Sequence, residues 1–289
     1  MSSHSLRKEQ KTLAFSRNNP PALEIDSGDT VTFETGDFAY ERLSKGEGVE
    51  AIGLANFNAV TGPVFVRGAE PGDVLKIEIE DVTVTRAWSV WLPDFGALGG
   101  QTRAIRVKQV QISGDRVFIN DRLSVPLQPM IGCIGVAPAE GEGSTFQPVY
   151  PFGGNMDLGE MAAGTTLYLP VQVPGGLLSM GDLHAAMGTA EPTWVGLEAA
   201  GSARLKISVE KGMKLAGPRL RIGSSTYCLG VAPTFAEAHQ RAMDQAFELL
   251  TGDWQLDPFD AYAYASACVD MRLGGPLGLI VMAVVPDPA

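Results

Sequence analysis

Residues 151–191 contain the polar groups whose types and spacing best suit chemistry on a small molecule. Within this segment, Gly181-Asp182-Leu183-His184 places a carboxylate and an imidazole two residues apart. Alternate side chains of an extended chain share one face, so the spacing suits two ligands of a single metal ion. A histidine with carboxylates leaves positions open for water or a carbonyl oxygen. Because an isolated Asp-x-His is also common as an internal hydrogen-bonded pair, the spacing alone leaves both interpretations open.

A second polar motif of this segment follows two glycines. Gly153-Gly154-Asn155-Met156-Asp157 has the composition of a ligand-facing loop, because glycine permits close approach of the backbone. We expect Gly154 and Asn155 to contact a substrate and Asp157 to join the predicted metal site. Glu191 ends the segment and supplies one more carboxylate for a ligand or acid-base role.

Residues 130–143 run from an apolar stretch containing Cys133 into an acidic turn. Glu140 and Glu142 in this turn would bring a general base to the mouth of a pocket, although two glutamates in a turn are also commonly just solvated. Cys133 is a nucleophile only if a nearby base or a lowered pKa activates its thiol. A buried structural thiol is the favoured alternative.

The turn Gly68-Ala69-Glu70-Pro71-Gly72-Asp73 is a third candidate for contact with a substrate. It either places Glu70 in a pocket or is a purely structural turn. The chain has no G-x-S-x-G motif, no P-loop and no G-x-G-x-x-G between a strand and a helix. Serine hydrolases, nucleotide hydrolases and dinucleotide enzymes therefore lack their usual motifs here.

The elements that must position these residues are mostly strands. The 34 glycines and 19 prolines separate short β-prone runs, which is the pattern of an all-β sandwich or barrel. Residues 29–34 and 74–84 alternate polar and apolar side chains, as strands with one buried face do, and we expect them in one sheet. Further strands are predicted over residues 102–111, 116–119, 166–173, 195–197 and 203–209.

Helices are expected only in the last third of the chain. Residues 234–250 begin with Thr234 and Glu237 in the spacing of a capping box and continue with apolar residues at helical spacing. Residues 257–269 begin with an aspartate cap followed by proline at the first helical position. Residues 277–285 are almost continuously apolar and predict a buried strand.

The sequence therefore predicts a mainly β chain with an α+β C-terminal part. Residues 1–200 are expected to form a β-sandwich-rich part that carries the pocket. Residues 201–289 are expected to form the α+β part, and the two parts to pack as one compact unit.

Composition limits the partners of this chain. Its 22 Lys and Arg against 33 Asp and Glu give a net charge of -11, which disfavours nucleic acid and anionic membranes as partners. Residues 1–15 lack the apolar run of a signal peptide, and no stretch approaches the roughly 20 apolar residues that span a bilayer. Three widely spaced cysteines indicate neither a disulfide framework nor a CxxC zinc site. We expect a soluble, cytoplasmic protein with reduced thiols.

Several long motifs occur in a fixed order over nearly the whole chain. They are Ser27-Gly28-Asp29-Thr30-Val31, Thr61-Gly62-Pro63, Gly68-Ala69-Glu70-Pro71-Gly72-Asp73, Gly135-Val136-Ala137-Pro138-Ala139-Glu140, Gly153-Gly154-Asn155-Met156-Asp157 and Gly181-Asp182-Leu183-His184-Ala185-Ala186-Met187-Gly188. In these motifs the chain resembles the acetamidase/formamidase family. The resemblance implies a jelly-roll-like β-sandwich with an appended helix-containing layer, and assembly into homo-oligomers. It also implies hydrolysis of a short amide such as formamide or acetamide to ammonia and a carboxylate, with the Asn155/Asp157 and Asp182/His184 loops as the pocket.

The working hypothesis is a metal-assisted amide hydrolase. Asp157, Asp182 and His184, with Glu34 or Glu191, are predicted to hold a divalent metal ion. Such an ion polarises the amide carbonyl and lowers the pKa of an attacking water, while Glu140 or Glu142 carries the proton. Zinc suits histidine with carboxylates and is the favoured ion, whereas calcium or magnesium suits a site dominated by carboxylates.

Two other interpretations stay open. The family tends to read Asp-Gly-Glu after Met187-Gly188, whereas this chain has Thr189-Ala190-Glu191. This departure makes a non-catalytic small-molecule-binding β-sandwich on the same scaffold the main rival. The other is a metal-free enzyme with Cys133 as its nucleophile.

Overall fold

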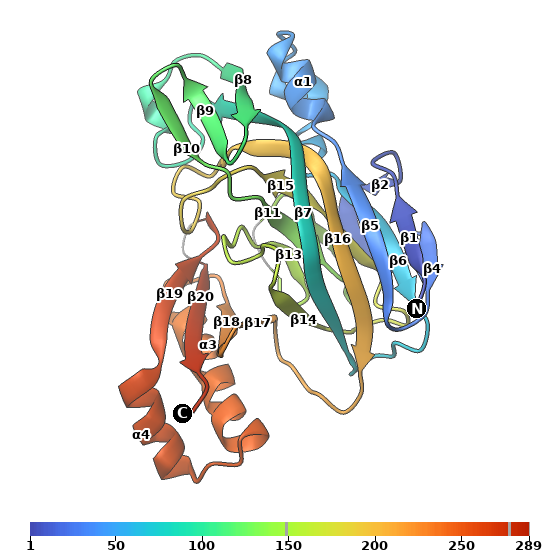
Figure 1. Ribbon diagram of the computed structural model, residues 1–289, viewed down its shortest axis with the longest axis vertical. Helices are drawn as coiled ribbons and strands as arrows, with labels where there is room; N and C mark the ends of the chain where they lie inside the picture. Colours follow the sequence, from blue (N-terminus) through green and yellow to red (C-terminus); the bar gives the residue numbers. More distant parts are fainter. Residues whose placement is uncertain (148–149, 277–278, 289) are drawn as a thin grey trace.

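Two long antiparallel strands run through the centre of the computed structural model, which describes residues 1–147, 150–276 and 279–288 (Figure 1). They are β7 (Val74–Trp91) and β16 (Glu198–Glu210), and they pair along the whole length of β16. Strand β5 (Asp29–Thr35) lies on the other side of β16, and β1 (Ser3–Leu6) pairs with β5 in parallel. These strands form the first layer of a sandwich.

The far end of β7 continues into a small antiparallel extension of this layer. It consists of β8 (Arg106–Ser113), β9 (Arg116–Asn120) and β10 (Leu123–Pro126), joined in that order. Short helical segments lie between the strands of the first half: α1 (Phe38–Ser44), α2 (Val49–Ile52), η1 (Leu54–Asn56) and η2 (Gly99–Gln101).

The second layer is built around two central strands, β6 (Val60–Val66) and β15 (Leu178–His184). Its other strands are β2 (Lys11–Thr12), β4 (Leu23–Ile25), β11 (Met130–Gly135) and β13 (Gly153–Asn155). A separate two-stranded sheet joins β3 (Ala14–Ser16) to β12 (Glu142–Ser144).

The two layers share one buried core and meet at a corner. Phe33 and Leu205 of the first layer and Ile134 and Met180 of the second are fully buried members of the same apolar cluster. The layers join where the end of β15 pairs with the start of β16. This corner holds His184, so the candidate site lies at the junction of the two layers.

Strand β14 (Thr166–Pro170) carries the sheet into the C-terminal part, because it pairs with both β7 and β17 (Arg219–Ile222). The order continues through β18 (Ser225–Val231), β20 (Ile280–Pro286) and β19 (Asp270–Gly274). Helix α3 (Phe235–Glu248), the π-helical turn Leu249–Asp253 and α4 (Pro258–Cys268) pack beside these strands around a second, alanine-rich core (Figure 1). None of the described helices combines the length and apolarity needed to cross a bilayer.

The predicted fold class, a mainly β chain with a helix-containing C-terminal layer, is confirmed. Thr234 caps α3 as predicted: its hydroxyl accepts a hydrogen bond from the Glu237 backbone N–H and donates one to the Glu237 carboxylate, in place of the bond from the Thr234 backbone N–H that completes a capping box. The strands predicted over 29–34 and 74–84 lie in one sheet, although β16 separates them. The division predicted at residue 200 falls within β16, whose pairing with β7 continues to Glu210.

Several predicted strands differ from the structure in detail. The strand predicted over 102–111 is β8, which begins at Arg106, and the strand predicted over 166–173 is β14, which ends at Pro170. The strand predicted over 195–197 is wrong: these residues lie in the loop before β16, where the Gly196 N–H bonds the side chain of Glu198 instead of a neighbouring strand. The strand predicted over 277–285 is present as β20 from Ile280, and its first two residues lie outside the described chain.

Candidate functional site

His184 and Glu198 are register partners where β15 and β16 pair, and His184 Nε2 lies 3.5 Å from Glu198 Oε2. Asp182, two residues before His184, places its Oδ1 3.5 Å from the same nitrogen. The two side chains therefore reach the same point from one strand, as their spacing predicts.

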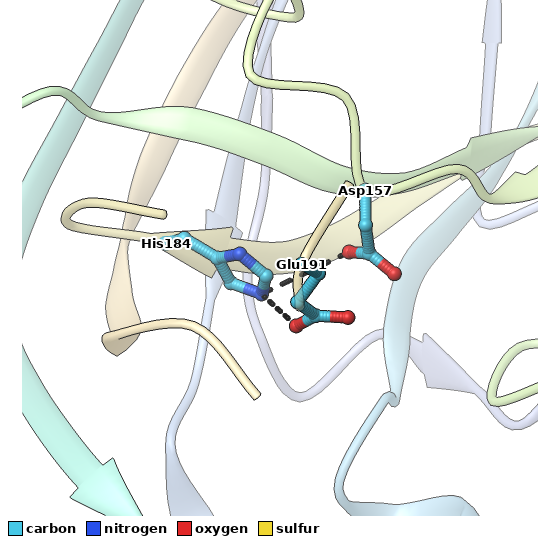
Figure 2. A group of neighbouring side chains, drawn as sticks. All are labelled: Asp157, His184 and Glu191. Carbon is cyan, nitrogen blue, oxygen red and sulfur yellow. Dashed lines mark ion pairs between the residues drawn. The ribbon is translucent and has the colours of Figure 1, made fainter. Parts of the chain in front are cut away.

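Two further carboxylates approach His184 from loops (Figure 2). Asp157, just after β13, has its Oδ1 3.9 Å from His184 Nε2, and Glu191, in the loop between β15 and β16, has its Oε1 4.0 Å away. Figure 2 shows the same edge of the imidazole facing both carboxylates. We call these residues the His184 cluster: Asp157, Asp182, His184, Glu191 and Glu198. No side chain in it is more than 6% exposed.

Gly132 of β11 makes room for the carboxylates. A Cβ at this position would lie 2.6 Å from Asp157 Oδ1 and 2.7 Å from Asp182 Oδ2, closer than real contacts allow. Its carbonyl also accepts the backbone N–H of Asp157, which orients the loop after β13. A side chain at residue 132 would therefore fill the space in which the two carboxylates approach one another.

Neighbouring polar groups orient three members of the His184 cluster. The Tyr40 hydroxyl donates to Glu198 Oε2 at 2.8 Å, and the Gly196 N–H donates to Glu198 Oε1. Asn58 Nδ2 donates to Asp182 Oδ2 at 2.9 Å. The Nδ1 atom of His184 lies 3.3 Å from Met187 Sδ.

Asp157 differs from its neighbours because both of its carboxylate oxygens are buried without a hydrogen-bond partner among the described residues. A buried polar group without a partner is costly, and a proton, a water or a cation would satisfy it. Of these three, a cation would also face the other carboxylates and His184 Nε2.

Burial and crowding shift the protonation of the His184 cluster. Burial, reinforced by neighbouring carboxylates, raises the pKa of Asp157 well above its usual value, and burial also raises the pKa of Asp182. Burial raises the pKa of Glu191 to about 8. Although burial opposes the imidazolium, Glu198 and Asp182 raise the pKa of His184 well above its usual value. Burial likewise opposes ionisation of Glu198, yet the imidazole of His184 lowers the pKa of Glu198.

Four members of the His184 cluster, Asp182, His184, Glu191 and Glu198, line a cavity of about 160 Å³. Its polar lining residues are Asn58, Gln147, Asn155, Asp182, His184, Glu191 and Glu198, and the remainder are mainly apolar and aromatic. A small ligand in this cavity would therefore meet both carboxylate and imidazole groups and apolar side chains.

The model of the Acetamidase/Formamidase family matches residues 3–141 and 135–277 of this chain. The chain belongs to this family. Acetamidase from Bacillus halodurans is 34% identical, with a TM-score of 0.89 over 97% of this chain and 95% of that one. A predicted acetamidase/formamidase from the thermophile Thermoanaerobacter tengcongensis is 32% identical, with a TM-score of 0.92 over 99% and 96% of the two chains.

The match to one formamidase relative is more distant and covers only part of both chains. Formamidase of Methylophilus methylotrophus is 25% identical, and the match covers 68% of this chain and 64% of that protein. The chain thus spans less than two thirds of the length of this relative.

Of the residues expected from the acetamidase/formamidase resemblance, the structure brings five to the cavity or the His184 cluster. They are Asn155, Asp157, Asp182, His184 and Glu191. Asn155 accepts a hydrogen bond from Asn58 at 3.0 Å and lines the cavity. Gly154 is buried in β13 and pairs with Ile134, so its contribution is to the backbone that carries Asn155.

The structure does not bring four predicted site residues to the cavity. Glu34 is exposed because β5 buries Val31, Phe33 and Thr35 and turns Glu34 to the opposite face. Glu70 is exposed in the turn before β7, where its backbone N–H bonds the Asp73 carboxylate. The metal role predicted for Glu34 and the substrate role predicted for Glu70 are therefore withdrawn.

Glu140 and Glu142 lie away from the cavity as well. Both are exposed, because the chain leaves the core after β11 and pairs β12 with β3 on the surface. Neither is a cavity-lining residue, so the prediction of a proton carrier in this turn is corrected.

Cys133 has the properties of a buried structural thiol. It is fully buried in β11 and donates to the Thr145 carbonyl. Burial, followed by the charges of Asp182 and Asp157, raises the pKa of the thiol well above its usual value. A nucleophilic cysteine needs the opposite shift, so this environment does not activate Cys133.

Sequence reasoning missed Glu198, Asn58 and Tyr40. Glu198 begins a long alternating strand. A charged residue at the buried end of such a strand indicates a candidate site residue. Asn58 and Tyr40 lie in short segments without a motif, and only the packing of α1 and the loop before β6 brings them to the site.

Proposed function

We propose that this chain is an amidase that hydrolyses the C–N bond of a small linear amide to ammonia and a carboxylate. The observation that carries the proposal is one buried imidazole surrounded by four carboxylates at the end of a ligand-sized cavity. Membership of the acetamidase/formamidase family, and the names of the acetamidase and formamidase relatives, support the same reaction.

We infer that Asp182, His184 and Glu198, whose ligand atoms all lie within 4.8 Å of one another, hold a divalent metal ion, with Asp157 beside them. The unpartnered oxygens of Asp157 and the space beside Gly132 support this assignment. The bonds from Asn58 and Tyr40 are typical of the outer groups that orient metal ligands. One nitrogen with carboxylate oxygens suits zinc, and calcium or magnesium would suit the carboxylates. A bound divalent ion would supply Lewis-acid polarisation of the amide carbonyl and a lowered pKa for the attacking water.

Glu191 is the proton carrier of the proposal. It lines the cavity, and its pKa of about 8 allows the carboxyl group to exchange a proton near neutral pH. It accepts a proton from the attacking water and passes one to the departing nitrogen. Asn155 lines the same cavity and is placed to contact the amide group.

The test is ammonia release from formamide, acetamide, propionamide and aromatic amides by the purified protein. We expect turnover that a chelator abolishes and that one of zinc, magnesium or calcium restores. Amide binding without ammonia release would favour the non-catalytic binding protein, and turnover that survives complete metal removal would overturn the metal assignment.

We also propose that the chain forms a homo-oligomer through its C-terminal part. Helix α4 exposes Phe259 and Tyr262, which are 75% and 65% accessible, and β19 exposes Met271 and Leu273. Among the described strands β19 pairs with β20 alone, so its other edge is free to pair. Exposed aromatic residues and an open strand edge are each typical of a protein interface.

A further inference from the structure

Three aromatic side chains among the cavity-lining residues lie close to one another. Phe95 lies between Phe146 and Trp194, with ring centroids 6.1 Å and 5.5 Å away. All three line the cavity, and all three are only half-buried. We call these residues the aromatic wall.

The backbone fixes the aromatic wall in place. Gly96 packs so closely on the next loop that a Cβ there would lie 2.0 Å from the Thr193 carbonyl oxygen. Trp194 adopts a positive φ of 60°, and its N–H bonds the Glu191 carbonyl at 2.8 Å. The loop that supplies Glu191 to the His184 cluster therefore also supplies one ring of the wall.

The rest of the lining favours an uncharged, apolar group. Phe57, Val90, Leu92 and Val195 extend the apolar surface, and no lysine or arginine occurs among the described lining residues. The carboxylates of the His184 cluster would repel an anionic group on the substrate. A negatively charged substituent therefore finds no cationic partner among the described lining residues.

The size of the cavity suits an aryl ring. Its volume is about 160 Å³, and an apolar cavity of roughly 150 Å³ is large enough to hold benzene. Formamide and acetamide carry at most a methyl group on the carbonyl carbon and leave the aromatic wall without a contact. Stacked or edge-on aromatic contacts would stabilise a bound ring further.

We propose that the preferred substrate is an uncharged primary amide whose acyl group carries an aromatic ring, as in phenylacetamide. This inference rests on the proposed amidase function. Water adds to the carbonyl carbon, the C–N bond breaks, a proton passes to nitrogen, and ammonia and the aryl carboxylic acid are the products. The ring stays against the aromatic wall while the amide group faces Glu191 and His184.

The decisive quantity is the ratio of kcat/KM for phenylacetamide to kcat/KM for acetamide. We expect the metal-supplemented wild-type protein to favour phenylacetamide by at least roughly tenfold, the lower end of what one apolar group contributes in a pocket. Phe95→Ala and Trp194→Ala should each lower this ratio about tenfold. Phe95→Leu preserves packing and should lower it less.

Phe235→Ala is the matched control, because Phe235 is an exposed aromatic residue at the start of α3. It should leave the ratio unchanged, and thermal unfolding checks that each variant is folded. Binding of phenylacetamide to the metal-free protein gives a second readout. It should change the tryptophan fluorescence of the wild-type protein through Trp194, and it should not change the fluorescence of Trp194→Phe.

The outcomes separate this inference from the proposed function. Turnover of acetamide with kcat/KM equal to or above that of phenylacetamide overturns the aryl preference and retains the amidase. A preference that Phe95→Ala and Trp194→Ala leave unchanged overturns the role of the wall. No ammonia from any amide overturns the amidase function, and with it this inference.

Discussion

Glu198 Oε2 lies 3.5 Å from His184 Nε2, and the two residues are partners across the first antiparallel pairing of β15 with β16. Both side chains are buried, and the Tyr40 hydroxyl and the Gly196 N–H occupy the two oxygens of Glu198. The pairing of two strands thus fixes the central contact of the site.

Glu198→Gln should lower metal affinity strongly, because it removes a negative charge from the predicted ligand set. Even changes to groups that only orient ligands cost about 10–100-fold in affinity, so the loss should reach at least that range. Metal content after dialysis checks this by elemental analysis. Glu34→Gln is the control, since Glu34 is exposed on β5 and should retain wild-type metal content. Equal metal loss in both variants would contradict the assignment.

Glu191→Gln should lower kcat while the protein keeps its metal. Positioned proton transfer contributes typically about 10²–10⁴-fold, so a loss in kcat of that order is expected. Steady-state ammonia release and metal content are measured together. Glu140→Gln, at the exposed turn first predicted to carry the proton, should behave as wild type. Loss of metal in Glu191→Gln would instead make Glu191 a ligand.

The metal-free protein should lose stability as pH rises. The pKa of Glu191 is raised from 4.5 to about 8 in the folded state. The folded protein therefore holds this proton more tightly than the unfolded chain, and the resulting stabilisation is lost as pH rises from about 4.5 to about 8. Asp157 and His184 also have raised pKa values, and their contributions likewise fall as pH rises. Glu198, whose pKa is lowered, acts in the opposite direction and loses its contribution as pH falls.

Thermal unfolding of chelator-treated protein between about pH 5 and 8 measures this dependence. Tm should decrease over the range, and the decrease should be smaller in Glu191→Gln. A Tm that rises over the range, or the same slope in both proteins, would be inconsistent with a buried Glu191 of raised pKa.

Gly132→Ala should disturb the site without changing any charge. The new methyl group would press on Asp157 Oδ1 and Asp182 Oδ2, so the carboxylates must move apart and both metal content and kcat should fall. Gly252→Ala is the control, because a Cβ at Gly252 meets nothing within 4 Å. Wild-type metal content in Gly132→Ala would show that the close approach at residue 132 has no role in metal binding.

Phe259→Ser with Tyr262→Ser should shift the protein to a smaller assembly, since polar side chains on α4 weaken an apolar interface. Light scattering coupled to size exclusion measures the mass. Phe235→Ser, on the neighbouring helix α3, is the comparison and should not change it. A monomeric wild-type protein would exclude the proposed interface.

The sequence by itself determined the local parts of this protein. Alternation predicted β5 and β7, and the capping box at Thr234 predicted α3, because each depends on residues close together in the chain. The spacing of Asp182 and His184 likewise placed both on one side of a strand. The same alternation in β5 turns Glu34 away from the core, so the sequence already argued against Glu34 as a ligand of a buried metal ion.

Only the tertiary structure decided which distant residues complete the site. Glu198 reaches His184 through strand register, Asn58 reaches Asp182 across 124 residues, and Tyr40 reaches Glu198 across 158. Register and packing depend on the whole buried core, and local periodicity carries no information about which strands become neighbours. For the same reason, the aromatic wall and the exposed position of Glu140 appeared only once the layers were assembled.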